Sequence, residues 1–482
     1  MNTISNHKNI VKSTSIFGFV QVLRLVIRIV SNKFISLFLG PSGIGLIGLF
    51  ENTILLISSL TSLGISTTGV REVALAENNP EQEAEIIAVL NKWSIILGFF
   101  GAIVTVLFSG FLSILVFGSS DKYYLFMLLS VSFFFSAFSS TRAAILQGKR
   151  KLKLIVISNI IASFFIAISS LTLYYFYRID AIVYVLLVSS FITFVVNIAV
   201  TRTLAKSQYS ISFRTAFLKG QRLIKLGFLL SINVIFGQVC FYIIRVFLNF
   251  ADASNETLGF YETNNVLLVA YLGMVFSAMS NDYYPSLTAI IDEQNEFVKL
   301  VNDQVEIAIL IVTPAIIFMY LADVYIIKIL YSDKFLPVIE ILKISLFSLI
   351  LRAIAWPLGF IALAKGNNRE YFKQNVMSDG LNILLTILFY SLFGLQGIGI
   401  ALVLNTLVFL VYLLIFAKRA YAFQFNYSVK KVIFICLTLG ILAFGSKMIF
   451  NSKFQYFILG ILFVFSALYS LLLIKKRIKS KV

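Results

Sequence analysis

VKSTSIFGFVQVLRLVIRIVSNKFISLF, residues 11–38, is the stretch that decides the fold. It is longer than the roughly twenty apolar residues that cross the hydrocarbon core of a bilayer, yet it contains two arginines. Gln21, Arg24, Arg28 and Asn32 follow one another at spacings of three, four and four residues, which places them on one face of a helix. A guanidinium near the membrane centre costs at least about 2.5 kcal/mol, so such a face lines a protein interior or a wet cavity. This cationic wall predicts an anionic cargo.

The composition predicts a polytopic membrane protein. The 482 residues are 59% hydrophobic and 13% charged, with a mean hydropathy of +0.93, which is typical of a chain built from membrane spans. The net charge is +18, but the basic residues lie between apolar stretches, so we predict no nucleic-acid partner. His7 is the one histidine, and Cys240 and Cys436 both fall inside apolar spans. We therefore expect no disulfide framework, no metal site and no cofactor.

Basic connectors predict how the chain is oriented in the membrane. We expect about fourteen transmembrane helices and no strands. Lys and Arg gather in the connectors around residues 149–153, 202–225 and 418–431 and in the tail after residue 475, whereas the alternate connectors are poor in them. The positive-inside rule places such basic connectors in the cytoplasm. Both termini are therefore expected in the cytoplasm, with an even number of spans between them.

An internal repeat predicts two lobes. GLFENT at Gly48 resembles GFYETN at Gly259, and each comes soon after a span with an arginine in its middle. The second of these spans repeats the polar face, at spacings of four, three and four residues, with Gln238, Tyr242, Arg245 and Asn249. We predict two parallel six-helix lobes, residues 1–210 and 211–420, because an even number of spans preserves orientation. Residues 421–482 form an extra C-terminal helix pair with a basic cytoplasmic tail.

Three motifs resemble a known family. They are KFISLFLGPSGIGLIGLFEN at residues 33–52, GISTTGVRE at residues 64–72 and LQGKRKLK at residues 146–153. With two six-span bundles, they resemble the polysaccharide-repeat-unit (O-antigen) flippases of the multidrug/oligosaccharidyl-lipid/polysaccharide exporter superfamily. The resemblance implies a fold similar to that of the multidrug antiporters known as MATE transporters. It also implies alternating access that moves an undecaprenyl-diphosphate-linked oligosaccharide from the cytoplasmic to the periplasmic leaflet of a bacterial inner membrane.

The resemblance and the polar faces together nominate site residues for such a cargo. Guanidinium groups match a diphosphate with planar, charge-assisted hydrogen bonds, and the candidates are Arg24, Arg28 and Arg245. Candidates for hydrogen bonds to sugars are Gln21, Asn32, Asn197, Gln238, Tyr242 and Asn249. Glu51 and Glu262 are candidates for gating or for coupling to a proton or sodium ion, although interfacial ion pairing is the plainer interpretation. For the arginines, the alternative is a structural role, with backbone carbonyls or a neighbouring carboxylate as partners.

Other functions remain open at this stage. A proton- or sodium-coupled multidrug antiporter shares the fold but needs carboxylates in mid-span, and a flippase for the peptidoglycan precursor lipid II carries the same diphosphate. A membrane polymerase or ligase is disfavoured because the outward connectors are short, and a scaffold has no reason to bury arginines. GILAFGSK at residues 440–447 resembles a phosphate loop, but it lies in an apolar span and is rejected as a nucleotide site. We expect a non-enzymatic monomer, with the polysaccharide polymerase machinery as a candidate partner.

Overall fold

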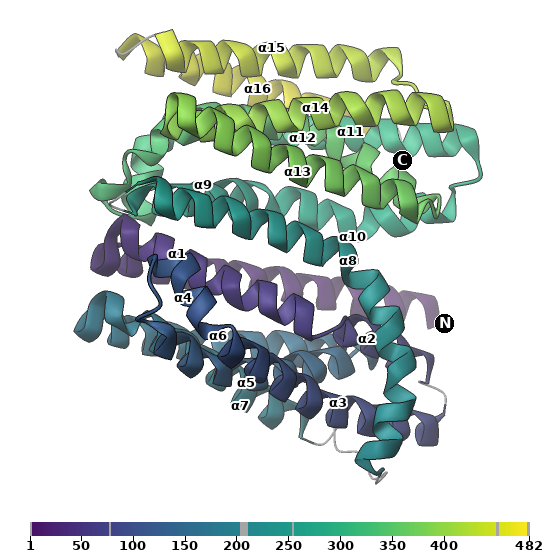
Figure 1. Ribbon diagram of the computed structural model, residues 1–482. Coiled ribbons are helices and arrows are strands. Elements are labelled where there is room, and N and C mark those ends of the chain that lie inside the picture. The colour runs from purple at the N-terminus through teal and green to yellow at the C-terminus, as the bar shows by residue number, and fades with distance from the viewer. Residues whose placement is uncertain (1, 77–78, 203–210, 253–254, 450–452, 480–482) are drawn as a thin grey trace. The chain divides into compact units, whose positions relative to one another are not determined.

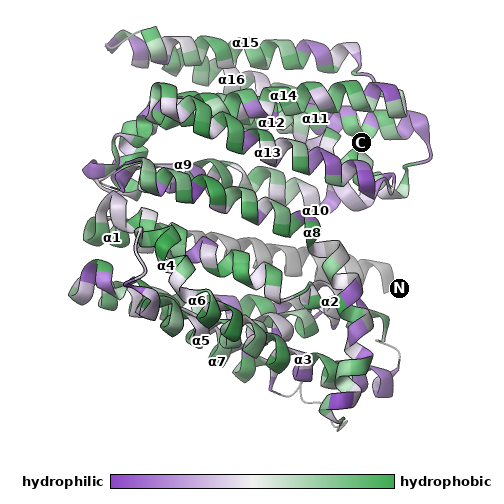
Figure 2. Ribbon diagram, viewed as in Figure 1, coloured by the Kyte–Doolittle hydropathy of each residue, from purple (hydrophilic) through white to green (hydrophobic). Residues whose placement is uncertain are grey.

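The computed structural model describes residues 2–76, 79–202, 211–252, 255–449 and 453–479, and within these ranges it describes no side chain before Val26. Every regular element in the described ranges is helical, which confirms the predicted all-α fold. The chain divides into two compact units, residues 1–255 and 256–482. In each unit hydrophobic residues cover most of the length of the helices, and hydrophilic residues gather toward their ends (Figure 2).

Eleven helical stretches of the described chain are long and apolar enough to cross a membrane, or twelve if the bent pair Glu256–Leu272 and Met274–Ala289 counts as one span. The predicted number of about fourteen is therefore not confirmed. Two of the eleven stretches are unusually long, with 36 residues in Val26–Thr61 and 49 residues in Lys153–Thr201. The first is interrupted at Gly40, whose φ of 68° ends one helix and lets Pro41 begin the next.

Unit 1 is a bundle in which α5 packs between α3 and α7, and α6 packs against α7, with α1 and α8 alongside (Figure 1). One cluster of its core buries Ile65, Leu90 and Trp93 together. The helices are α1 (Asn2–Thr61), α2 (Ile65–Leu75), α3 (Pro80–Leu107), α4 (Ser109–Phe117), α5 (Tyr123–Gly148), α6 (Leu152–Tyr177), α7 (Ile182–Thr201) and α8 (Phe213–Ala251).

Helix α8 belongs to unit 1 by its packing. The indole Nε1 of Trp93 donates a hydrogen bond of 2.9 Å to the carbonyl of Ala216, and its ring stacks on Phe217 at 5.3 Å between centroids. The turn before α2 also touches α8, since a Cβ added at Gly64 would lie 2.2 Å from the carbonyl oxygen of Gly227. The compact units therefore divide after residue 255, whereas the repeat predicts a lobe boundary at residue 210. The repeat itself stays a prediction.

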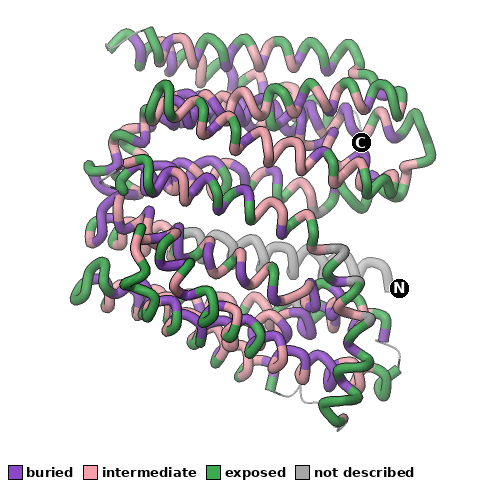
Figure 3. The backbone as a smooth tube through the Cα atoms, in the orientation of Figure 1, coloured by how far each residue is buried: buried purple, intermediate pink, exposed green. Residues whose placement is uncertain are grey.

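Unit 2 is organised around α12, most of which is buried between α11, α14 and α15 (Figure 3). The C-terminal helix pair falls within the predicted segment 421–482, and both of its members pack against α11. The elements are α9 (Glu256–Asn265), a π-helix (Val266–Leu272), α10 (Met274–Ala289), α11 (Gln294–Leu330), α12 (Val338–Ala364), α13 (Asn368–Phe393), α14 (Leu395–Tyr421), α15 (Tyr427–Ile449) and α16 (Lys453–Lys479).

Candidate functional site

The first helical part of α1 carries the predicted cationic face. The side chains of Gln21 and Arg24 lie outside the described part of the chain. Arg28 is exposed and Asn32 is half-buried. Arg28 lies eleven residues before Leu39, which corresponds to about 16 Å along a helix axis. With Leu39 taken as the edge of the hydrocarbon core, that distance is close to half its roughly 30 Å thickness, and we expect the guanidinium to face a wet surface and not lipid.

The polar face of α8 is mostly used for packing inside unit 1. Arg245 is 8% exposed, and its Nη1 donates a hydrogen bond of 3.1 Å to the carbonyl of Phe241 one turn earlier. The Thr53 hydroxyl donates to the Tyr242 hydroxyl at 3.1 Å, which joins α1 to α8. Asn249 donates from Nδ2 to the carbonyl of Val116 at 2.8 Å, at the C-terminal end of α4. The predicted roles of these side chains in cargo binding stay predictions.

Gln238 is the one predicted sugar-binding residue that lines a described cavity. This cavity has a volume of about 230 Å³ and lies inside unit 1, between α1, α2, α3, α5 and α8. Nine of its sixteen lining residues carry a hydroxyl group, and none of the sixteen is charged. We call it the hydroxyl cavity; its polar lining consists of Ser58, Ser59, Thr61, Ser62, Ser66, Ser94, Ser136, Ser140, Thr141 and Gln238.

Several of these hydroxyl groups donate to their own helix. Ser59 donates to the carbonyl of Leu56 at 2.7 Å, and Thr61 donates to that of Ile57 at 2.8 Å. The Ser58 hydroxyl, by contrast, is buried and has no hydrogen-bond partner in the described structure. A hydroxyl that donates its proton to a backbone carbonyl keeps lone pairs on its oxygen. Hydroxyl groups of this kind can therefore still accept a hydrogen bond.

The remaining candidates lie elsewhere. Asn197 is half-buried on α7 and is not among the lining residues of the hydroxyl cavity. Glu51 is exposed on α1 of unit 1, and Glu262 is half-buried on α9 of unit 2. Among the described residues, no group of three or more His, Cys, Asp or Glu side chains comes together as a metal site would require. Gating or ion coupling by the two glutamates stays a prediction.

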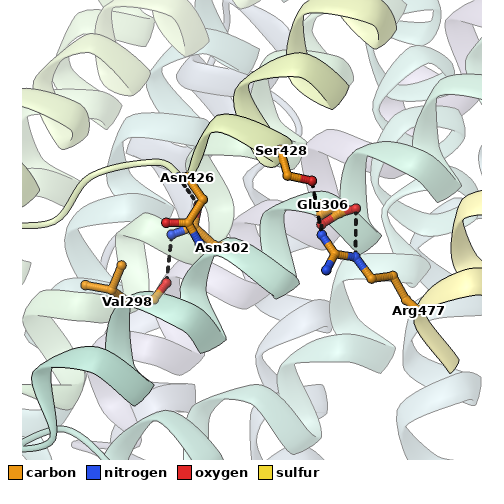
Figure 4. Close-up of polar contacts among 6 residues, drawn as sticks. All are labelled: Val298, Asn302, Glu306, Asn426, Ser428 and Arg477. Atoms are coloured by element: carbon orange, nitrogen blue, oxygen red, sulfur yellow. Dashed lines mark hydrogen bonds and ion pairs between the residues drawn. The ribbon is translucent and has the colours of Figure 1, made fainter. Parts of the chain in front are cut away.

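A charged face on α11 escaped the sequence analysis. The carboxylate of Glu306, whose side chain is 3% exposed, receives two hydrogen bonds from Arg477 of α16, at 2.6 and 3.2 Å (Figure 4). One turn earlier, the Asn302 carboxamide accepts from the backbone N–H of Asn426 at 2.9 Å. Its Nδ2 donates to the carbonyls of Val298 and Gln424. These contacts join α11 to α16 and to the connector that leads into α15.

A second ion pair lies farther along the same helix. The Nζ of Lys447, on α15, is 2.7 Å from Oδ2 of Asp323, and the two side chains are 9% and 2% exposed. Lys447 thus pairs with a carboxylate and has a structural role. This contact agrees with the rejection of residues 440–447 as a phosphate loop. The available signal was a pair of carboxylates, Glu306 and Asp323, on either side of the apolar middle of α11. For the hydroxyl cavity, the signal was the density of Ser and Thr in SSLTSLGIS, residues 58–66.

The fold and these sites are those of a multi-pass membrane protein with a polar interior. Comparison with protein families identifies the family to which the chain belongs. The model of the family described as "Polysaccharide biosynthesis protein" matches residues 35–340. The chain therefore belongs to this family. No curated protein matches it significantly in sequence.

Solved structures share the fold. The lipid II flippase MurJ, in an inward closed conformation, is similar at a TM-score of 0.74 and 16% identity, over 96% of this chain and 99% of that one. An inward-facing MATE multidrug resistance transporter gives a TM-score of 0.66 at 15% identity, over 84% and 95% of the chains. A transporter of the MOP superfamily from Pyrococcus furiosus, described as having a binding pocket of reverse polarity, gives a TM-score of 0.60 at 16% identity. The match covers 85% of this chain and 93% of that one. The resemblance of the sequence to this exporter superfamily is confirmed.

Proposed function

We propose that the protein is a flippase that moves an undecaprenyl-diphosphate-linked oligosaccharide, such as an O-antigen or another surface polysaccharide repeat unit, across a bacterial inner membrane. Membership of a polysaccharide biosynthesis family supports the cargo class. The fold shared with a lipid II flippase over 96% of the chain supports a translocation function. The observation that carries the proposal is the exposed guanidinium of Arg28 on a membrane-crossing helix.

The chemistry of such a cargo explains why a cation is needed there. The diphosphate and the sugars must leave water and cross the membrane, whereas the polyprenyl tail can stay in lipid. Arg28, with Arg24 one turn earlier in sequence, offers the planar donor fork that binds phosphate oxygens at two points. We propose alternating access as the means of transport. We further propose that both termini lie in the cytoplasm, as the basic connectors predict.

The test is flipping of a fluorescent undecaprenyl-diphosphate-linked oligosaccharide in proteoliposomes. A hydrogen bond to a charged group contributes about 1.5–3 kcal/mol, so Arg28→Ala and Arg24→Ala should each lower flipping roughly ten- to a hundredfold. Arg214→Ala removes an exposed arginine from the start of α8 and serves as the matched control. Equal melting temperatures in detergent show that all variants are folded.

Two results would overturn the proposal. If the parent protein moves no lipid-linked sugar but exports a cationic dye against a proton or sodium gradient, it is an antiporter. If it moves lipid II and no other lipid-linked oligosaccharide, its cargo is the peptidoglycan precursor.

A further inference from the structure

We infer that the hydroxyl cavity of unit 1 is a subsite for one neutral sugar residue of the cargo, separate from the cations that hold the diphosphate. This inference rests on the proposed flippase function and specifies the kind of sugar. Three properties of the cavity carry it: the absence of charge among its sixteen lining residues, its acceptor-rich surface and its size.

The lack of charged lining residues excludes charged occupants of the cavity. A diphosphate or a cationic drug that leaves water needs an opposite charge nearby, because burial of an unpaired ion is costly. The sixteen lining residues include no Lys, Arg, Asp or Glu. The cavity therefore suits a neutral occupant, and the diphosphate must be held elsewhere.

The chemistry of the lining separates neutral from acidic sugars. Ser59, Thr61, Ser94 and Ser140 each donate to a backbone carbonyl of their own helix, at 2.7, 2.8, 2.7 and 3.0 Å. A hydroxyl that donates in this way keeps lone pairs that a sugar hydroxyl can satisfy by donating. The carboxylate of an acidic sugar would find no Lys or Arg among the sixteen lining residues to offset its charge. Gln238 adds both a donor and an acceptor, and the unpartnered Ser58 hydroxyl is available for either role.

The size of the cavity suits one sugar ring. A volume of about 230 Å³ is many times the roughly 10–15 Å³ that one water requires on this measure. It lies below the roughly 300–1,000 Å³ of pockets for drug-sized ligands. The lining also contains Leu55, Leu97 and the ring of Phe133, which can cover the apolar face of a pyranose. Hydroxyl groups and an aromatic surface in one small cavity match the two kinds of surface that a sugar ring presents.

The experiment compares two labelled lipids that differ only in their sugar. Equilibrium binding to the purified full-length protein in lipid nanodiscs is measured with undecaprenyl diphosphate and with undecaprenyl-diphosphate-linked N-acetylglucosamine. Net hydrogen bonds contribute about 0.5–1.5 kcal/mol each. We therefore expect Ser58→Ala and Ser140→Ala each to weaken binding of the sugar-bearing lipid about two- to tenfold, with binding of undecaprenyl diphosphate unchanged.

Two further variants make the result specific. Ser132→Ala is the matched control, because Ser132 lies on the same helix as Ser140 and donates to the carbonyl of Leu129 in the same way, but does not line the cavity. It should bind both lipids as the parent does. Ala137→Leu fills the cavity from the α5 wall and should abolish the extra affinity that the sugar confers. A lipid whose first sugar is glucuronic acid should gain no affinity from its sugar.

The outcomes separate this inference from the proposed function. Equal binding of both lipids by the parent, or a loss of both lipids in the cavity variants, overturns the sugar subsite while flipping by the parent still supports a flippase. Tighter binding of the glucuronic acid lipid than of the neutral one overturns the preference for a neutral sugar. Absence of flipping by the parent overturns the proposed function itself.

Discussion

The hydroxyl cavity of unit 1 and the charged face of α11 in unit 2 are two opposite ways to place polar groups inside a membrane protein. In the hydroxyl cavity the groups are neutral, several hydroxyls donate to their own helix, and space is left beside them. On α11 two carboxylates, whose side chains are 2% and 3% exposed, pair with cations on neighbouring helices. The comparison teaches that the buried ion pairs of α11 hold helices together, whereas the neutral polar groups around the hydroxyl cavity are placed to bind an occupant.

The two ion pairs of α11 lie far apart along the helix. Glu306 and Asp323 are seventeen residues apart in sequence, or about 25 Å along the helix axis. This length approaches the roughly 30 Å of the hydrocarbon core. The C-terminal pair is thereby fastened to α11 near both of its ends, through Arg477 of α16 and Lys447 of α15. We expect α15 and α16 to stay attached to α11 during transport.

The largest expected effect is on the Asp323–Lys447 pair. Lys447→Met leaves a buried carboxylate without its partner, and loss of one member of a buried pair costs about 3–5 kcal/mol. The apparent melting temperature in detergent should fall strongly, and the double variant Asp323→Leu, Lys447→Met should recover most of the loss. Lys453→Met, at an exposed position of α16, is the control. A single variant as stable as the parent would show that this face is not held by charge.

A smaller effect is expected at the Glu306–Arg477 pair. Arg477 is 45% exposed, so water can partly replace it when Arg477→Gln removes the charge. We expect a loss of about 1.5–3 kcal/mol, the value for a charged hydrogen bond. Lys476→Gln changes an exposed neighbouring cation and should leave stability unchanged. Limited proteolysis should release α16 earlier in the Arg477 variant, and unaltered proteolysis would argue against this attachment.

The smallest expected effect on stability is in the hydroxyl cavity. Ser140→Ala removes a hydroxyl that donates only to the carbonyl of Ala137 in its own helix, and that removal strands no buried partner. We expect a change within about 0.5 kcal/mol, as for substitutions that touch no special feature. The melting temperature measures this directly. A loss comparable to that of Lys447→Met would make the cavity a structural feature and would erase the contrast between the two regions.

Local signals in the sequence predicted the elements of this fold. Apolar stretches of about twenty residues identify membrane helices because each helix satisfies its backbone hydrogen bonds internally. The break at Gly40 and Pro41 is also a local feature, since glycine adopts a positive φ easily. The spacing that put Arg28 and Asn32 on one face is also a local property of a helix.

The partners of the polar side chains were not predictable in the same way. Glu306 meets an arginine 171 residues later, and Trp93 meets a carbonyl 123 residues later. Asn249 and Tyr242 have the same helical spacing as a binding face, yet in the structure they hold α8 against α4 and α1. Helical periodicity shows which residues share a face, but it does not show what that face touches.

The sequence by itself determined an all-helical membrane protein with a cation on its first span, because hydropathy, charge and helical spacing act over short stretches of chain. Only the tertiary structure decided which polar groups form ion pairs and which surround open space. That distinction depends on helices brought together from distant parts of the chain. The hydroxyl cavity needs five of them, and no single helix contains enough of its lining to reveal it.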